Sequence, residues 1–273
     1  MPNLLIKDLR VIAAGLPEDI EEWPSIPCPT CGRGNLTPVS ETFTSEESKT
    51  SERIQSELWD DWEPDWTYGG FSCVLNCGKT TCDIVRVVGE MRVVAKVDEH
   101  GGWDGESWSV EYRPKLFHPS LPLLQSHEGA PRSVLGRVEA ASAVIWVDPS
   151  SAANRLRSAV EALMDDQGIP RKWSGNKGPF PLTLHQRIER LAAAKPAFAD
   201  AADMILAVKW IGNVGSHEDA LKITHVLEGV EILDFALAEI YDKSKETLKK
   251  LAADITARKG SPTPRMAPTL LDL

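Results

Sequence analysis

The sequence predicts an α+β protein, with a small antiparallel β-sheet in its first third and a bundle of α-helices in its second half. Two observations come from the pattern of apolar residues. β-Branched residues recur between positions 71 and 112, as in strands, whereas apolar residues recur at helical spacing from position 133 onward. The third is that two cysteine pairs lie in the first third. A chain of 273 residues is long enough for one large domain or two smaller ones.

The net charge of −10 is spread unevenly. Nine acids and two bases lie in residues 41–66, whereas 16 bases and 15 acids lie in residues 149–259. Binding of nucleic acid by the whole surface is therefore disfavoured, but a local basic groove in the second half is compatible with this balance. The sequence has no run of 18 apolar residues and no secretion signal, so we expect no membrane span and a cytoplasmic protein.

The cysteines predict a structural metal site. Cys28 and Cys31 form one pair, Cys73 and Cys77 form a second, and a glycine follows each pair, as a tight turn requires. These four thiolates can surround Zn²⁺ tetrahedrally. Such a set leaves no open coordination position, so a catalytic zinc is not expected. Cys82 is either an alternative ligand or a buried thiol.

Two other uses of the cysteines are less favoured. Disulfides are not expected in a chain that has an odd number of cysteines and no secretion signal. A redox C-x-x-C motif lies between a strand and a helix, whereas Pro27 and Pro29 indicate the turn of a ribbon.

The insertion between the pairs, residues 41–66, is acidic and rich in tryptophan. Its polar first part, residues 42–57, predicts a mobile loop. Its second part places three indoles and several carboxylates side by side. These side chains either anchor the chain in a basic groove of a partner protein or pack back on the sheet. The candidate partner-binding residues are Trp59, Trp62, Trp66, Asp60 and Asp61.

The remaining elements follow from periodicity. Strands are predicted at residues 71–75, 82–97 and 108–112, which places the first domain at 1–112. Proline-spaced residues then predict an extended linker without regular structure at 113–130. Helices are predicted at 133–147, 150–166, 182–194, 202–220 and 219–241, within a helical domain at 131–259, followed by a mobile tail at 260–273. Residues 171–181 form a basic, glycine-rich loop that lacks the residue order of a phosphate-binding loop.

An unusual polar face lies in residues 202–220. Lys209, Asn213, Ser216 and His217 follow at i, i+4, i+7 and i+8, which stacks them on one side of a helix. Gly212 and Gly215 are also present, and each costs about 1 kcal/mol relative to alanine inside a helix. The glycines indicate a close backbone approach, a break in the helix or a packed partner. The other interpretation is an amphipathic helix with a solvated polar edge.

From residue 112 onward, the order of motifs resembles a known family. A helix with Arg157 and Glu161, a second helix at 182–191, and a block containing Lys209, Asn213 and His217 are similar to the prokaryotic domain of unknown function 4145, of the HEPN-like helical superfamily. The resemblance covers about half of the chain. Proteins of this family often carry a cysteine-pair zinc module in front, which the cysteine pairs match. The resemblance implies a HEPN-like helical bundle, often dimeric, in restriction, anti-phage and toxin–antitoxin systems.

Two hypotheses for the function follow from this resemblance. The first is a binding module that docks on a toxin, nuclease or other defence-system subunit, or on RNA or DNA, and forms a homodimer through the helical domain. The second is a metal-independent ribonuclease, because active HEPN proteins carry an Arg-x(4–6)-His motif at a dimer interface. His217 would then act as general acid or base, Asn213 would orient the phosphate and Lys209 would stabilise its charge. Lysine replaces arginine here and seven residues separate it from His217, so the binding module is preferred.

Overall fold

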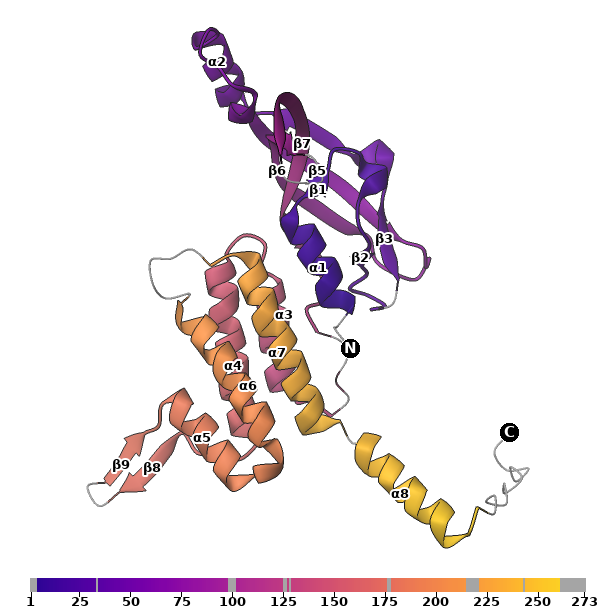
Figure 1. The fold of residues 1–273 in the computed structure, drawn as a ribbon, viewed down its shortest axis with the longest axis vertical. Coiled ribbons are helices and arrows are strands. Elements are labelled where there is room, and N and C mark those ends of the chain that lie inside the picture. The colour runs from indigo at the N-terminus through magenta and orange to yellow at the C-terminus, as the bar shows by residue number, and fades with distance from the viewer. Residues whose placement is uncertain are drawn as a thin grey trace.

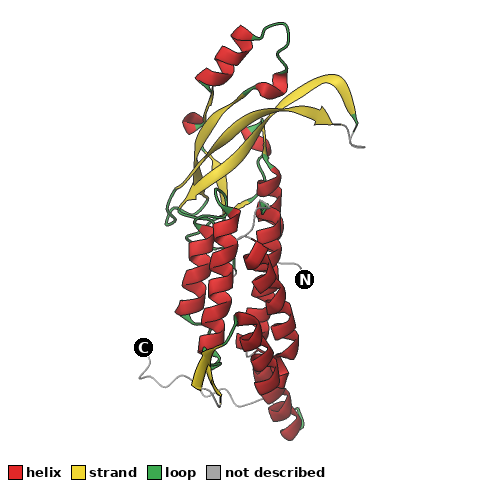
Figure 2. Cartoon of the chain, turned by 90° about the vertical axis from the view of Figure 1, so that its left-hand side faces the viewer, coloured by secondary structure: helices red, strands yellow, loops and turns green. Residues whose placement is uncertain are grey.

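A computed structural model describes residues 4–32, 34–97, 102–124, 127, 129–175, 178–214, 221–242 and 244–260. An antiparallel sheet is formed by the first part of the chain and helices by the second, which confirms the α+β class. The molecule is elongated: a curled sheet lies above the ends of the long helices, and these helices run side by side (Figures 1 and 2). Within the described part of the chain, no helix is both long and apolar enough to cross a membrane.

The N-terminal sheet has the strand order β1-β7-β6-β5-β3-β2, and β4 pairs with β5. All pairings are antiparallel. The strands are β1 (Leu16–Pro17), β2 (Ile26–Pro27), β3 (Asn35–Pro38), β4 (Thr44–Glu47), β5 (Tyr68–Cys77), β6 (Val85–Val97) and β7 (Trp103–His118).

The long strand β7 corrects the prediction of a linker that begins at residue 113. Its residues remain paired with β6 as far as His118, and Pro114 lies opposite Gly89 at a register shift. Proline has no N–H to donate to a ladder, so a strand tolerates it at such an irregularity. A Cβ atom on Gly89 would lie 2.2 Å from the carbonyl oxygen of Arg113, so glycine permits the close approach of the two backbones.

The prediction of a mobile loop at 42–57 is wrong. This segment forms β4 and helix α2 (Lys49–Glu57), and a short 3-10 helix follows at Pro64–Trp66. The Ser48 side chain accepts the N–H of Ser51 and caps α2, while the buried Ser51 hydroxyl donates to Glu47 at 2.6 Å. Local hydrogen bonds made by polar side chains stabilise this segment. A prediction of disorder from low hydrophobicity does not take such bonds into account.

Helix α1 (Leu4–Ala14) is an element that the sequence analysis missed. Its buried side chains Ile6, Leu9 and Ile12 pack into a core that continues from the sheet to the helices. Arg10 of α1 donates to Glu231 of the helical body at 2.7 Å. The first helix therefore joins the two parts of the protein.

The helical body confirms most of the predicted helices. They are α3 (Arg132–Ser142), α4 (Pro149–Asp166), α5 (Leu184–Ala194), α6 (Ala199–Val214), α7 (Ile223–Tyr241) and α8 (Ser244–Ala257). The side chain of Asp148 caps α4, and Thr183 with Gln186 forms a capping box on α5. Helix α8 points away from the body (Figure 1). The predicted basic loop is a hairpin, β8 (Lys172–Gly175) and β9 (Gly178–Pro181).

Helices α4, α6 and α7 pack closely through glycines. A Cβ atom on Gly212 of α6 would lie 2.7 Å from Cβ of Arg157 on α4, and one on Gly229 of α7 would lie 3.2 Å from Cδ1 of Ile211 on α6. The predicted close approach at Gly212 is thus confirmed, and its neighbour is α4. Gly215, Ser216 and His217 lie outside the described residues.

Candidate metal centre

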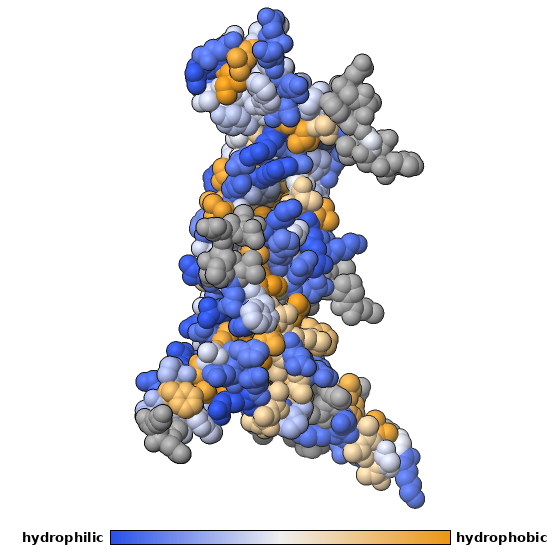
Figure 3. Space-filling view, turned by 60° about the vertical axis from the view of Figure 1, so that its left-hand side comes forward, coloured by the Kyte–Doolittle hydropathy of each residue, from blue (hydrophilic) through white to orange (hydrophobic). Residues whose placement is uncertain are grey.

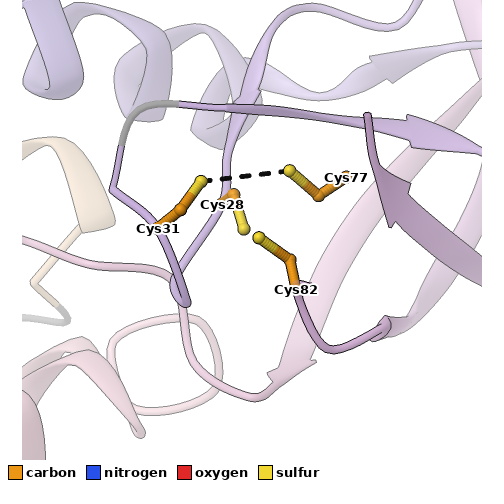
Figure 4. A group of neighbouring side chains, drawn as sticks. All are labelled: Cys28, Cys31, Cys77 and Cys82. Atoms are coloured by element: carbon orange, nitrogen blue, oxygen red, sulfur yellow. Dashed lines mark hydrogen bonds between the residues drawn. The ribbon is translucent and has the colours of Figure 1, made fainter. Parts of the chain in front are cut away.

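Four cysteine sulfurs converge where two turns of the sheet meet. Cys28 and Cys31 lie in the turn between β2 and β3, whereas Cys77 and Cys82 flank the turn between β5 and β6. The four Sγ atoms lie within 4.8 Å of one another, and those of Cys31 and Cys77 are 3.9 Å apart (Figure 4). The two turns are neighbours because β3 pairs with β5, with Leu36 opposite Cys77.

The distances between the sulfurs fit a tetrahedral thiolate site. A Zn–S bond of about 2.3 Å places the sulfurs of a tetrahedron about 3.8 Å apart. The separation of Cys31 and Cys77 is 3.9 Å, and no two of the four sulfurs are more than 4.8 Å apart. The donor set is therefore compatible with a divalent metal that prefers soft ligands, such as Zn²⁺.

The predicted ligand Cys73 is not part of this cluster. Cys73 and Cys77 both lie in β5, where four residues span about 13 Å, so one metal ion cannot bind both sulfurs. The buried Cys73 thiol instead donates to the carbonyl oxygen of Val74 at 3.3 Å. Burial raises its pKa, against a weaker opposing effect of Thr42. Cys82 takes its place, which was the alternative that the sequence left open.

Backbone hydrogen bonds shape the turn that contains Cys28 and Cys31. The N–H of Cys28 donates to Gly34 O and the N–H of Gly32 donates to Cys28 O, both at 2.9 Å. Gly32 has φ +61°, the left-handed conformation that glycine adopts most easily. The N–H of Gly34 donates to the Cys31 sulfur at 3.2 Å. Such an N–H···S bond stabilises the thiolate form.

Gly34 is a site residue that the sequence analysis did not find. A Cβ atom on it would lie 2.6 Å from the Cys77 sulfur and 3.1 Å from the Cys31 sulfur. Gly78, on the second turn, has nothing within 4 Å of the same position. The two turns can approach each other only because residue 34 has no side chain. Gly34 could have been found from the sequence by its position, three residues after the second cysteine of the C-x-x-C pair.

The packed sulfurs oppose one another's ionisation. Burial, followed by the hydrogen bonds of Cys77 and Cys31, raises the pKa of the Cys82 thiol to about 12. Thiolates must form before a metal binds, so a cation that occupies this site displaces protons and its affinity falls with decreasing pH.

The turn with Cys28 and Cys31 also lies at the junction of the sheet and the helices. Residues 29–32 line a hollow of about 550 Å³ together with residues 120–124 and α3. His127 lies at the edge of this hollow, and its Nε2 is 2.6 Å from Oδ1 of Asp234 on α7. A metal that fixes the turn therefore also shapes the contact between the two parts of the protein.

The predicted partner-binding residues divide into two groups. Trp59 is 75 % exposed, Trp66 is also exposed, and Asp60 and Asp61 point into solvent beside them. Trp62 folds back, and its buried Nε1 has no hydrogen-bond partner among the described residues. Trp62 therefore fits the interpretation in which the indoles pack back on the sheet, and partner binding by the exposed Trp59 and Trp66 stays a prediction.

The predicted polar face of 202–220 is only partly described. Lys209 is 9 % exposed, and its ammonium nitrogen lies 3.3 Å from the ring centroid of the neighbouring Trp210. Asn213 lies half-buried one turn further along α6. The histidine of the motif, His217, lies outside the described residues. The lysine thus packs on an indole ring rather than extending into solvent.

Comparison with known proteins gives two family matches. Residues 139–258 match the family described as Domain of unknown function (DUF4145), and residues 18–117 match Domain of unknown function (DUF8608). No curated protein and no solved structure matches the chain. The helical part is therefore similar to the DUF4145 family, as its motifs predict, and the sheet that carries the cysteines is similar to a second family of unknown function.

Proposed function

We propose that this protein is a two-part binding module of a prokaryotic defence or toxin–antitoxin system. Its N-terminal sheet, a zinc ribbon held by structural Zn²⁺, presents a protein-binding surface, and its helical body is a HEPN-like bundle that forms a homodimer. The exposure of Trp59 at the tip of the sheet is the observation that carries the proposal.

The protein-binding surface is the acidic tryptophan surface, formed by Leu58, Trp59, Asp60, Asp61 and Trp66. It lies next to α2, at the end of the sheet far from the helical body (Figure 1). An apolar area surrounded by hydrophilic surface is visible at this end (Figure 3). Large exposed indoles gain much free energy when a partner covers them, and the surrounding carboxylates attract a basic partner and repel nucleic acid. A basic toxin or nuclease would suit this surface.

The zinc ion has a structural role in this proposal. Four thiolates, from Cys28, Cys31, Cys77 and Cys82, fill a tetrahedral coordination shell and leave no position for substrate or water. The ion would hold together β2 and β3, which have only two and four residues. Strands this short supply few hydrogen bonds of their own.

Exposed apolar residues on the helical body support the homodimer. Met204 and Trp210 of α6 and Phe235 of α7 are exposed although these two helices pack against each other and against α4. Helix α8 carries a further apolar stripe of Leu248, Leu251 and Ile255. A second copy would remove these side chains from water, as the resemblance to dimeric HEPN-like proteins implies.

The ribonuclease hypothesis has weaker support. Lys209 would have to leave the Trp210 ring before it could reach a phosphate. We therefore expect RNA incubated in metal-free buffer to remain intact with the wild type and with His217→Ala. Cleavage by the wild type that His217→Ala abolishes would instead establish the ribonuclease.

The protein-binding role can be tested in cells that naturally contain the protein. Tagged wild type, a Trp59→Ala/Trp66→Ala variant and a Val147→Ser control are purified, and the proteins that accompany them are quantified by mass spectrometry. Val147 is exposed and apolar but lies outside the proposed surface. A partner should accompany the wild type and the control only, and the purified partner should bind the double variant at least about 30-fold more weakly. If the same proteins accompany all three in equal amounts, the acidic tryptophan surface is not the binding site.

A further inference from the structure

We infer that the β8–β9 hairpin and the adjoining face of α5 form a binding surface for single-stranded nucleic acid. Trp173 and Phe180 would stack on bases, and Lys172 and Arg190 would contact phosphates. This stacking surface goes beyond the proposed protein-binding role. It also lies at the opposite end of the molecule from the acidic tryptophan surface (Figure 1).

The two aromatic side chains form a cross-strand pair. Trp173 and Phe180 are directly opposite each other in the β8–β9 ladder, so their side chains lie on the same face of the hairpin. Trp173 is 45 % exposed and Phe180 is 44 % exposed. If the pair served only to anchor the hairpin on the bundle, both rings would be covered. Slightly less than half of the surface of each residue instead remains exposed to solvent.

A cation already stacks on one of these rings. The guanidinium carbon of Arg190 on α5 lies 3.8 Å from the ring centroid of Trp173. This contact docks the hairpin on α5 and fixes the indole in place. A planar guanidinium and an indole in one stack give a base two kinds of surface on which to pack.

The sequence around the hairpin is the basic part of an acidic protein. Residues 167–195 contain six bases and one acid, whereas the whole chain has a net charge of −10. The bases are Arg171, Lys172, Lys177, Arg187, Arg190 and Lys195, and the acid is Glu189. Clustered positive charge of this kind is the electrostatic signature of a nucleic-acid site.

Some of these bases are occupied by neighbouring groups. Arg171 and the buried Arg187 both bind the carboxylate of Asp165, and Lys195 donates to Gln167 at 2.8 Å. The hairpin residue Lys172 is exposed, and Arg190 is half-buried against Trp173. Lys172 is therefore available to phosphates. Arg190 lies over Trp173 with its guanidinium, and unlike the ammonium of Lys209 on Trp210, a stacked guanidinium keeps N–H groups at its edge that can donate to a phosphate.

The nearby acids are also engaged. Asp165 is neutralised by its two arginines, and Asp166 accepts a hydrogen bond from Tyr241. Glu189 lies 3.3 Å from His185, one turn away on α5. Asp165 is thus neutralised by cations, whereas Asp166 and Glu189 keep a negative charge, which the six bases of residues 167–195 outnumber.

The chemistry favours single-stranded nucleic acid over an acidic peptide or a duplex. A peptide carboxylate would use the two cations but not the two ring faces. The bases of a duplex are stacked on one another, so the rings cannot reach them, whereas the bases of a single strand are free to stack on aromatic side chains. The space-filling view shows a small apolar area within mainly hydrophilic surface at this end of the molecule (Figure 3).

Fluorescence anisotropy with the full, zinc-loaded chain tests this inference. The probes are labelled 12-nucleotide strands of uridine and of thymidine, and a 12-base-pair duplex. The single strands should bind at least about tenfold more tightly than the duplex, and their affinity should fall as salt rises, with a log–log slope of about −1 to −2. Similar affinities for RNA and DNA indicate stacking alone, and a preference for RNA indicates an added contact to the 2′-hydroxyl.

The variants separate stacking from charge. Trp173→Ala/Phe180→Ala should weaken binding at least about tenfold, because stacking on each base is lost. Trp173→Phe keeps a ring and should bind within about threefold of the wild type. Lys172→Glu should weaken binding and flatten the salt dependence by about one phosphate contact. Val147→Ser serves as the control that leaves binding unchanged.

A second measurement guards against loss of the hairpin in the alanine variant. Wild-type protein is photocrosslinked to a strand that contains 5-bromouridine, and the adducts are located by mass spectrometry. We expect adducts on Trp173 or Phe180. Adducts confined to other residues, equal affinity of the double alanine variant, or full competition by polyglutamate would each overturn the inference. Binding of the protein partner is measured separately, so either surface can fail without the other.

Discussion

The N-terminal sheet and the helical body are stabilised by different physical means. The sheet has strands as short as β2, with two residues, and its two turns meet at four cysteine sulfurs. The helical body has no such cluster among its described residues, and α4, α6 and α7 instead pack closely at Gly212 and Gly229. The sheet is therefore suited to stabilisation by a bound cation, whereas the helical body depends on the shape of its own side chains.

This difference shows where each part of the protein is vulnerable. A metal site concentrates stability in a few ligands, so the loss of one ligand affects a whole turn. In a close-packed bundle, stability is distributed over many contacts. The loss of folding free energy on substitution is therefore local and increases with the number of atoms added or removed. Helix α1 joins the two because it packs against both the sheet and α7.

Removal of the metal should have the largest effect. A structural zinc ion stabilises a small domain by on the order of 10 kcal/mol. A strong chelator should therefore release the turns that contain Cys28 and Cys82 while α4 and α6 stay folded. Hydrogen exchange followed by mass spectrometry, with and without chelator, measures this. Equal loss of protection in the sheet and in the helices would show that the two parts unfold as one unit.

The helical body should respond most to a methyl group at Gly212. A Cβ atom there would lie 2.7 Å from Cβ of Arg157 and 3.1 Å from the carbonyl oxygen of Ala153. Gly212→Ala should therefore destabilise the protein by about 1–2 kcal/mol, although alanine favours helices. Gly136→Ala is the matched control: its Cβ would lie in open space within α3, so it should stabilise by about 0.5–1 kcal/mol. Urea unfolding followed by circular dichroism distinguishes the two signs.

The metal site should respond to the corresponding change at Gly34. Because a Cβ atom would press on the sulfurs of Cys77 and Cys31, Gly34→Ala should lower zinc affinity by at least about tenfold, as disturbance of groups around metal ligands does. Gly78→Ala, with open space around its Cβ, should bind zinc like the wild type. Competition with a chromophoric chelator gives both affinities. Equal affinities would mean that the two turns can separate without loss of the metal.

The smallest effect is expected at Asp165 under acid conditions. The hydrogen bond from Arg171 is the main cause that lowers the pKa of Asp165 to about 2, and Arg187 adds to it. A carboxyl group with a lowered pKa stabilises the folded state above its usual pKa, and this contribution is lost as the pH falls from about 4 to about 2. Asp165→Asn should cost about 1 kcal/mol at pH 7, since the partly exposed pair is screened by solvent. The difference from wild type in urea unfolding should shrink towards pH 2, and a difference that is constant with pH would exclude the charge as its cause.

The helices were easier to predict from the sequence than the sheet. Helices α4, α5 and α7 carry apolar residues at regular spacing together with local capping residues such as Asp148 and Thr183, so each can be identified from its own segment. The strand β7 continues through Pro114 because Gly89, on another strand, leaves room for it. No local pattern carries that information.

Local sequence was also insufficient to predict all four cysteines of the candidate metal site. The pair Cys28 and Cys31 is local, and both of its residues join the sulfur cluster because they lie in one turn. The pair Cys73 and Cys77 has a similar spacing, but an extended strand separates its sulfurs. Only knowledge that β5 continues to Cys77 could have transferred the fourth position to Cys82. Helix α1, by contrast, could have been predicted from its own segment, because Ile6, Leu9 and Ile12 have helical spacing. That signal was missed.

The metal content of two serine variants tests the central claim most directly. Cys73→Ser and Cys82→Ser are purified in parallel with the wild type, and bound zinc is measured by inductively coupled plasma mass spectrometry. Cys73→Ser should retain about one zinc ion per chain, as the wild type does, whereas Cys82→Ser should lose most of it. Full retention of zinc by Cys82→Ser together with its loss from Cys73→Ser would contradict the proposed metal centre.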